Sequence, residues 1–213
     1  MRPYDLDVSP RPSIPRRRER ILETAERLVL ERGFDAMTMQ ELASSVGIAK
    51  GSIYLEFGSK DNVLEALLAA STQRMLSTAQ QQLAGSRAPS LSRGYRALAA
   101  ALLDEPLLCA AFLDDGGVLG EQVSRVSDGR YRERHRLVAQ WIRELQGAGR
   151  LRSDVDADSL ALALSSATLG LLTAAKTLGP LERQDLLGAL EALALMTSSL
   201  ESEPEPAPQE GEP

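Results

Sequence analysis

The sequence has almost none of the side chains from which enzymes build metal or nucleophilic sites. Among its 213 residues Cys109 is the only cysteine and His135 the only histidine. A disulfide within the chain is therefore impossible, and a zinc site would lack its usual thiolate and imidazole ligands. The sequence also has no glycine-rich phosphate loop and no nucleophile elbow. It therefore predicts neither an enzyme nor a bound metal or cofactor.

Aromatic residues and long apolar runs are scarce as well. Aromatics make up 4% of the chain, whereas 43% of its residues are hydrophobic, with leucine and alanine abundant. This composition favours an all-α fold with a substantial core. No apolar run reaches the roughly 18 residues needed to cross a bilayer, and the N-terminus has prolines and acids in place of a signal peptide's hydrophobic region. We therefore expect a cytoplasmic protein with no membrane partner.

The net charge of −6 is distributed unevenly along the chain. Five arginines and one glutamate lie between Pro10 and Arg20, whereas residues 201–213 carry five glutamates and no basic residue. A basic segment attracts phosphates locally even when the whole chain is acidic. The negative total therefore does not exclude DNA as a partner.

The most informative segment runs from Thr38 to Lys60. Thr38 and Glu41 have the spacing of a capping box at the start of a helix. Apolar residues then repeat at helical spacing until Gly47, a residue able to end the helix in a left-handed conformation. A second short helix begins within a few residues and carries polar groups near its N-terminus. Two short helices joined by a glycine turn predict a helix-turn-helix, whose second helix fits the major groove of DNA.

The run GIAKGSIYLEFGSKDNVL, preceded by ERGFDAMTMQELA, strongly resembles the DNA-binding domain of the TetR family of bacterial transcriptional regulators. The resemblance covers roughly residues 16 to 68. It implies an all-α protein of about nine helices, with a three-helix DNA-binding domain followed by a helical domain for effector binding and dimerisation. The expected divisions are a flexible arm at 1–14, the helix-turn-helix domain at 15–60, the effector-binding and dimerisation domain at 61–200 and a disordered acidic tail at 201–213.

The resemblance also implies which residues touch DNA. Thr38 and Lys60 occupy positions at which the family contacts phosphates, and Tyr54 is expected at a phosphate or a base. The arginines before the first helix either contact phosphates or the minor groove, or form only a solvated helix start. These arginines are Arg16, Arg17 and Arg18. Base reading is assigned to Gln40, Lys50, Gly51, Ser52 and Leu55, since lysine donates to guanine, glutamine bridges adenine and leucine meets a thymine methyl.

Three positions depart from the family pattern. Ala49 stands where a serine often caps the helix, and Leu55 where an aromatic residue is common. Glu56 stands where histidine or tyrosine is common, and its carboxylate repels phosphate unless it accepts from a cytosine amine or pairs with an arginine. Residues 1–60 carry only ten basic against nine acidic side chains. Together with Glu56, this balance supports an alternative, a helical sensor or interaction protein whose DNA-binding head is degenerate.

Helical periodicity continues through the second half of the chain. It predicts helices over 91–103, 106–113, 118–146, 157–178 and 180–200. The segment from Leu160 to Ala175 has no charged residue, so its helix must be covered on all sides. We expect it and the next helix to meet their copies across a two-fold axis, with burial inside one subunit as the alternative. The expected interface residues are Leu160, Leu164, Leu169, Leu172, Leu186, Leu190 and Leu193.

An effector pocket is expected among the helices of the second domain. Its candidate lining residues fall on inward helix faces, and ordinary core packing is the alternative for each of them. Their character predicts a largely apolar small molecule. The candidates are Met75, Tyr95, Leu102, Leu108, Cys109, Phe112, His135 and Trp141. With the resemblance, these features predict a homodimeric repressor that binds a pseudo-palindromic operator in double-stranded DNA and is released by the effector.

Overall fold

The computed structural model describes residues 14–84, 90–112, 116–120, 123–178 and 181–202. Within them the chain forms ten α-helices and no strand, so the predicted all-α class is confirmed. The helices group into two compact units, and the boundary between the units falls inside α4 (Lys60–Leu83). Met1–Ala70 and Gly117–Gly120 form the first unit, and Ser71–Gly116 and Glu121–Pro213 form the second.

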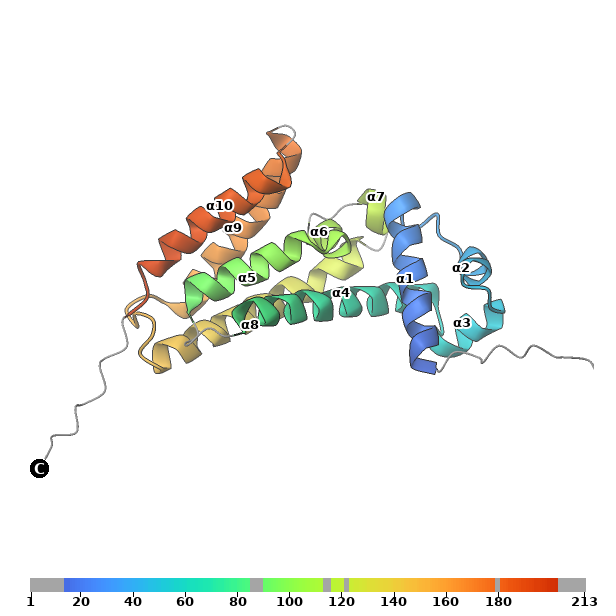
Figure 1. The fold of residues 1–213 in the computed structure, drawn as a ribbon, viewed down its shortest axis with the longest axis horizontal. Coiled ribbons are helices and arrows are strands. Elements are labelled where there is room, and N and C mark those ends of the chain that lie inside the picture. The colour runs from blue at the N-terminus through green and yellow to red at the C-terminus, as the bar shows by residue number, and fades with distance from the viewer. Residues whose placement is uncertain (1–13, 85–89, 113–115, 121–122, 179–180, 203–213) are drawn as a thin grey trace, which may run out of the picture. The chain divides into compact units, whose positions relative to one another are not determined.

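The first unit holds a three-helix arrangement and the start of α4 (Figure 1). α1 (Ile14–Arg32) packs on α2 (Met39–Val46), and α2 packs on α3 (Lys50–Phe57). Their apolar faces are fully removed from solvent, as the exposed fractions of 0% for Ile21, Leu42 and Ile53 show. Burial of these side chains is the main favourable contribution to holding the three short helices together.

A second segment of the chain joins the first unit. The backbone N–H of Phe34, which follows α1, donates to the carbonyl of Val118 in α7 (Gly116–Leu119) at 2.7 Å. The single helix predicted over 118–146 is therefore wrong, because the structure has α7 and then a separate α8 (Val123–Gly147). Gly120 lies between them with φ +62°, a left-handed conformation that breaks the helix. Its missing side chain also leaves room for the carboxylate of Asp35.

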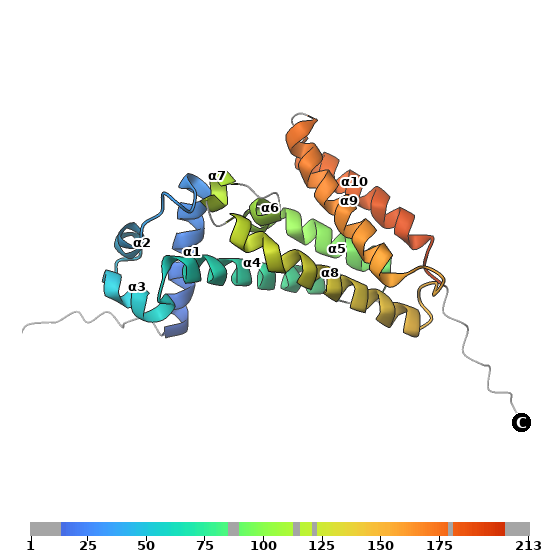
Figure 2. The same cartoon turned by 180° about the vertical axis from the view of Figure 1, so that it is seen from behind.

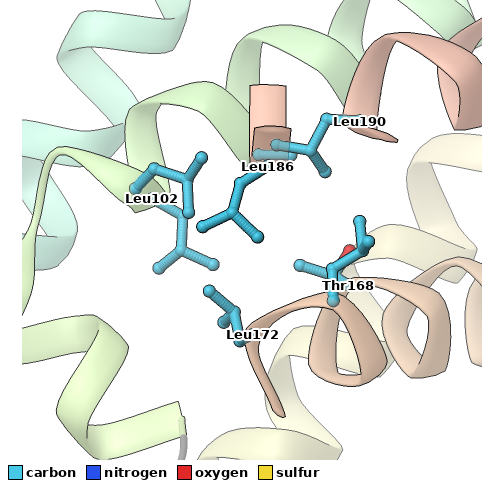
Figure 3. Close-up of a pocket in the computed structure, with 8 residues that line it drawn as sticks. Leu102, Thr168, Leu172, Leu186 and Leu190 are labelled. Carbon is cyan, nitrogen blue, oxygen red and sulfur yellow. The ribbon is translucent and has the colours of Figure 1, made fainter. Parts of the chain in front are cut away.

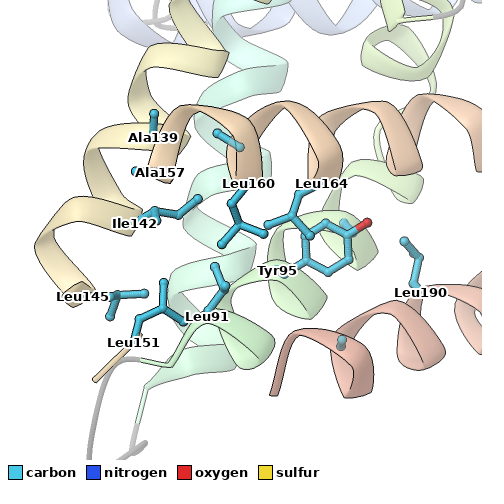
Figure 4. Packing of buried hydrophobic residues seen from close by; sticks show 13 residues of the cluster. Leu91, Tyr95, Ala139, Ile142, Leu145, Leu151, Ala157, Leu160, Leu164 and Leu190 are labelled. Atoms are coloured by element: carbon cyan, nitrogen blue, oxygen red, sulfur yellow. The ribbon is translucent and has the colours of Figure 1, made fainter. Parts of the chain in front are cut away.

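The second unit is a bundle built from the part of α4 that begins at Ser71 and from α5 (Leu91–Leu103), α6 (Pro106–Phe112), α8, α9 (Ala157–Thr177) and α10 (Arg183–Ser198). α10 packs on α5 and α8 packs on α9, and the two views in Figures 1 and 2 show α9 and α10 side by side. Their shared core is shown in Figure 4, where Leu91 and Tyr95 of α5 meet Ile142 of α8 and leucines of α9 and α10. Gly94 faces the Trp141 ring, since a Cβ at Gly94 would lie 2.6 Å from its Cζ2 atom.

The bundle extends two residues beyond the boundary at 200 that the sequence predicted. Glu201 and Ser202 are ordered: the N–H of Ser202 donates to the Arg150 carbonyl at 3.0 Å, and Glu201 forms a β-bridge with Leu151. The tail that was predicted to be disordered over 201–213 thus begins with two residues that hydrogen-bond to the bundle, and 203–213 lie outside the described residues. The Glu201 carboxylate accepts from the Ser90 hydroxyl at 2.6 Å and from the Ser92 N–H at 2.7 Å. It thus caps the N-terminus of α5 from 111 residues away.

Replacing this cap, Glu201→Gln, is expected to lower the free energy of unfolding by about 1 kcal/mol near neutral pH, because α5 loses a charge-assisted acceptor. Burial raises the pKa of Glu201, but hydrogen bonds from Ser90 and Ser92 and the charge of Arg93 outweigh it and leave the pKa lowered. Because the pKa of Glu201 is lower in the folded than in the unfolded state, its ionised carboxylate stabilises the fold. This stabilisation is fully present above the pKa of the unfolded state and is lost as the pH falls through the pKa of the folded state. Urea unfolding should therefore separate variant and wild type at pH 7, and the two should converge in acid.

The matched control is Glu65→Gln, which removes an exposed carboxylate on α4. Its unfolding midpoint should follow the wild type at both pH values. A stability loss in Glu201→Gln that persists unchanged in acid would contradict the role of the ionised carboxylate as the cap.

Candidate nucleic-acid interface

α3 turns one face to the core and the other to solvent. Ile53 and Phe57 are buried, and their burial fixes the rotation of the helix about its own axis. The opposite face is exposed, most of all Leu55, whose side chain is 91% accessible. The exposed residues of α3 are Lys50, Gly51, Tyr54 and Leu55, and Ser52 is half-buried. Leu55 therefore adds nothing to packing within the unit and is available to an outside partner.

The start of α2 presents a second polar group. Thr38 is the N-cap of α2, and its hydroxyl accepts from the Glu41 N–H at 3.0 Å. The predicted capping box also requires the Glu41 carboxylate to accept from the Thr38 N–H. In the structure the Glu41 carboxylate pairs with Arg32 instead. Gly47 ends α2 with φ +77°, as its position predicted. Thr38 and Gln40 are both exposed at this helix start.

Lys60 is fixed at the N-terminus of α4. Its ammonium group donates to the Asp35 carbonyl at 3.1 Å and lies 4.4 Å from the centre of the Phe34 ring. Ser59 caps the same helix, accepting from the Asn62 N–H at 3.1 Å. A helix N-terminus with a positioned cation beside it suits an anion, because the amide dipoles and the charge act together. The contacts of Lys60 thus hold its charge near the loop that joins α1 and α2.

The arginines of α1 lie against the helix-turn-helix. The Arg17 Nε donates to the Glu56 carboxylate at 3.2 Å, and a guanidinium nitrogen of Arg18 lies 3.9 Å from the other oxygen. Arg18 also lies over the Phe57 ring at 4.4 Å. Arg20, which the sequence did not single out, donates to the Val46 carbonyl at the end of α2 at 3.0 Å. Of the two partners left open for Glu56, the structure shows arginine.

The second unit contains a small apolar pocket, shown in Figure 3. Its volume of about 10 Å³ has room for one water molecule. Of the predicted effector residues whose side chains the structure describes, Leu102 alone lines it. The lining is completed by residues of α5, α9 and α10: Ala99, Leu103, Thr168, Leu171, Leu172, Leu186 and Leu190. The Thr168 hydroxyl is the polar group of this lining, and it hydrogen-bonds the Tyr95 hydroxyl at 3.0 Å.

Four predicted effector residues have packing or hydrogen-bonding roles instead. Leu108 is buried, Met75 packs against the alanines of α4 and α5, and Trp141 covers Gly94. The Cys109 thiol lies 3.2 Å from the Leu102 carbonyl. Burial, reinforced by the charges of the neighbouring carboxylates at 104 and 105, raises the pKa of Cys109 to about 11, so the thiol stays protonated at neutral pH.

Three candidates remain, and neither of the two whose side chains the structure describes lines the pocket. Tyr95 only hydrogen-bonds Thr168, which lines it. His135 is half-buried on α8, with its Nε2 atom 3.9 Å from the Asp158 carboxylate. The Phe112 side chain lies outside the described residues. The predicted effector residues therefore do not gather around one pocket but are spread through the bundle. A core helix packs against several neighbours, and its apolar pattern does not show which of them borders a cavity.

The leucines predicted at a dimer interface turn toward the subunit itself. Leu160, Leu164 and Leu190 lie in its core, Leu172 and Leu186 line the pocket, and Leu169 and Leu193 are half-buried. None of the seven is exposed. The exposed side of α9 carries Leu162, Ala163, Ser166, Gly170 and Thr173, and the exposed side of α10 carries Gly188, Ala192, Leu195 and Met196. We call these the outer stripes of α9 and α10. These nine residues carry no charge, whereas Asp158 in the first turn of α9 and Arg183 and Asp185 in the first turn of α10 are exposed.

α9 is also unusually apolar for a helix with so much free surface. By length and composition, Ala157–Ala174 would suffice to cross a membrane, a criterion that core helices of soluble proteins meet too. Only 22% of this segment is buried inside the subunit. The outer stripe of α9 therefore leaves uncovered apolar surface on a single chain.

The chain is similar to known regulatory proteins. Residues 21–67 match the family model of bacterial regulatory proteins, tetR family. The HTH-type transcriptional regulator YerO of Bacillus subtilis is 50% identical over 48 residues, which are 22% of this chain and 17% of that protein. The HTH-type transcriptional regulator UidR of Escherichia coli is 25% identical over 166 residues, which are 73% of this chain and 79% of that protein.

Two further similarities concern a repressor and a solved structure. The HTH-type transcriptional repressor Rv1474c of Mycobacterium tuberculosis is 35% identical over 66 residues, which are 31% of this chain and 35% of that protein. The crystal structure of a TetR-family transcriptional regulator from Rhodococcus sp. matches with a TM-score of 0.70 and 18% identity over 87% of this chain and all of that one. The structural match concerns the fold; the family model matches the helix-turn-helix, and the similarity to UidR extends over most of the chain.

Proposed function

We propose that this chain is a transcriptional regulator of the tetR family of bacterial regulatory proteins, and that it acts as a homodimeric repressor that binds a pseudo-palindromic operator and is released by a small-molecule effector. The observation that carries the proposal is the exposed face of α3, on which a lysine, a tyrosine and an almost fully exposed leucine lie together without a packing role. Repression is inferred from relatives that are named repressors, such as Rv1474c.

The exposed groups divide into those that position DNA and those that read it. Thr38 and Lys60 lie at the starts of α2 and α4, where helix N-termini favour phosphate. On α3, Lys50 suits guanine O6 and N7, and Leu55 suits a thymine methyl. Gly51 has open space where a side chain would be, which allows the DNA to approach the backbone closely. Gln40 is exposed at the start of α2, and its amide would suit adenine.

We infer that the dimer forms through the outer stripes of α9 and α10. Small and apolar residues without charge suit close helix contact in a two-fold interface. Leu162, Leu195 and Met196 are 60%, 63% and 68% exposed in the single subunit, a cost that association would remove. Two-fold symmetry would place two recognition helices about one DNA turn, roughly 34 Å, or a multiple of it, apart, which requires a pseudo-palindromic operator.

Release by an effector requires a change of the second unit. A cavity of about 10 Å³ is too small for an organic molecule, so an effector would have to prefer a conformation in which the pocket at Leu102 and Thr168 is larger. Its lining of leucines with one hydroxyl suits an apolar compound with few polar groups. The effector shifts the protein away from DNA only if it binds that conformation more tightly. As a DNA-binding regulator, the protein would act in the cytoplasm.

The alternative of a degenerate DNA-binding head rested mainly on Glu56. That carboxylate faces two guanidinium groups of its own chain. Its charge is therefore compensated before DNA arrives, and the main argument against DNA binding is removed. We accordingly keep one proposed function.

The test is to select duplexes from a random DNA library with the wild-type protein and to include the DNA that flanks its own coding region. We expect one pseudo-palindromic sequence to be enriched and bound more weakly as salt is raised. In Lys50→Ala/Tyr54→Phe its affinity should fall at least about 30-fold, because two contacts worth about 1–3 kcal/mol each are lost. Arg96→Ala, which removes an exposed, paired arginine from the second unit, is the charge control. Equal binding of wild type to every duplex would refute the proposal.

A further inference from the structure

Glu56 lies on α3, but its side chain is directed toward the arginines of α1 and not toward solvent. Its side chain is only 9% exposed, whereas that of the preceding Leu55 is 91% exposed. Leu55 therefore faces solvent, whereas the neighbouring Glu56 is largely buried. A carboxylate with so little access to solvent needs compensating charge, since an unpaired buried charge is strongly destabilising.

That compensation comes from α1. Arg17 binds one carboxylate oxygen of Glu56 at 3.2 Å, and Arg18 lies 3.9 Å from the other. The Arg18 guanidinium is also held over the Phe57 ring, and Arg20 holds the last turn of α2 through the Val46 carbonyl. We call Arg17, Arg18 and Glu56 the α1–α3 clasp. It ties the basic start of α1 to the helix that faces DNA, across 39 residues of sequence.

We propose that Glu56 is a positioning residue that raises the sequence specificity of this regulator by holding Arg17 and Arg18 on α3. The inference rests on the proposed function of DNA binding. Two free guanidinium groups beside a recognition helix attract any phosphate and so strengthen binding to all duplexes alike. Held by Glu56, they contribute one net positive charge in place of two, with fixed geometry. Specificity is a difference of affinities, and the clasp increases it by weakening the wrong complexes.

The competing role for Glu56 is base reading, in which its carboxylate accepts from a cytosine amine. The two roles exclude each other, because a carboxylate that reaches a base must leave Arg17 and Arg18. They also predict different results for Glu56→Gln. Loss of a clasp changes the affinity for every duplex, whereas loss of a base contact changes the preferred sequence at one position.

The experiment measures binding of full-length protein to a random 20-bp duplex and to the selected duplex over a range of salt concentrations. Glu56→Gln should bind the random duplex about 3- to 10-fold more tightly at low salt, with a steeper salt slope by about one to two, since each added phosphate contact contributes about 0.9 to the slope. It should select the same sequence as the wild type. Arg17→Gln/Arg18→Gln, which leaves the carboxylate unpaired, should bind both duplexes more weakly.

The matched control is Glu31→Gln, which removes the same charge from an exposed pair with Arg27 near the other end of α1. Random-duplex affinity and salt slope in Glu56→Gln no different from those of Glu31→Gln would overturn the proposal. So would selection of a sequence altered at one base position.

A second measurement separates this proposal from the proposed function. In urea, Arg17→Gln and Glu56→Gln should each lower the unfolding midpoint, and the double variant should lose much less than the two shifts combined, because both remove one interaction. Additive shifts would overturn the clasp. If the wild type enriches no sequence, the repressor proposal fails, while this cycle and the random-duplex measurement still decide whether Glu56 restrains the arginines.

Discussion

A Leu162→Glu/Leu195→Glu variant is expected to be monomeric and to bind the operator at least about 100-fold more weakly than the wild type. Both leucines lie on the outer stripes and are more than half exposed in the subunit, so the substitutions leave its core intact. In a dimer each glutamate would place a carboxylate in an apolar interface opposite its own copy, and an unpaired buried charge is strongly unfavourable. A monomer holds one half-site at a time and loses the gain from linking two recognition helices.

Mass measurement by sedimentation at several concentrations tests association, and the selected duplex tests binding. Leu137→Glu is the matched control, since Leu137 is 56% exposed on α8 and lies outside both outer stripes. This control should remain dimeric and bind normally. A dimeric Leu162→Glu/Leu195→Glu variant would show that the subunits meet through another surface.

Gly94→Ala is expected to lower the free energy of unfolding by about 1–3 kcal/mol, the cost of overpacking a well-filled core. The sign is opposite to the usual one, because glycine to alanine inside a helix ordinarily stabilises by about 1 kcal/mol. The new Cβ would lie 2.6 Å from Cζ2 of Trp141, and closer still to Cη2, so the indole would have to move. That ring packs against the cluster that joins α5, α8 and α9 (Figure 4), and the displacement would disturb several helices.

The control for this substitution is Gly51→Ala, also within a helix. Nothing lies within 4 Å of a Cβ built at Gly51, so alanine there should raise the free energy of unfolding by a few tenths to about 1 kcal/mol. Urea unfolding of the two variants beside the wild type should therefore give shifts of opposite sign. Stabilisation by Gly94→Ala would mean that the Trp141 side chain moves aside without loss of packing.

The helix-turn-helix was predictable because its determinants are local. Thr38 caps the α2 amide of a residue three positions on, and Gly47 takes the left-handed conformation that ends the same helix. Ser59 likewise caps α4 over three residues. Interactions of this range follow from residue type and spacing alone, so the sequence determined the all-α class, the ends of these helices and which side chains of α3 face outward.

Contacts between distant residues were decided by the tertiary structure. The sequence left Glu56 two possible partners, and packing of α1 on the helix-turn-helix brought Arg17 to it across 39 positions. The sequence predicts Glu201 in an acidic tail, whereas the packing of the bundle brings it to the start of α5, 111 positions away. On α9 the almost uniformly apolar sequence does not distinguish one face of the helix from another, so only the packing of α8 and α10 distinguishes buried Leu160 from exposed Leu162. Local spacing sets where helices begin and end, whereas the choice among equivalent faces and partners depends on which helices meet.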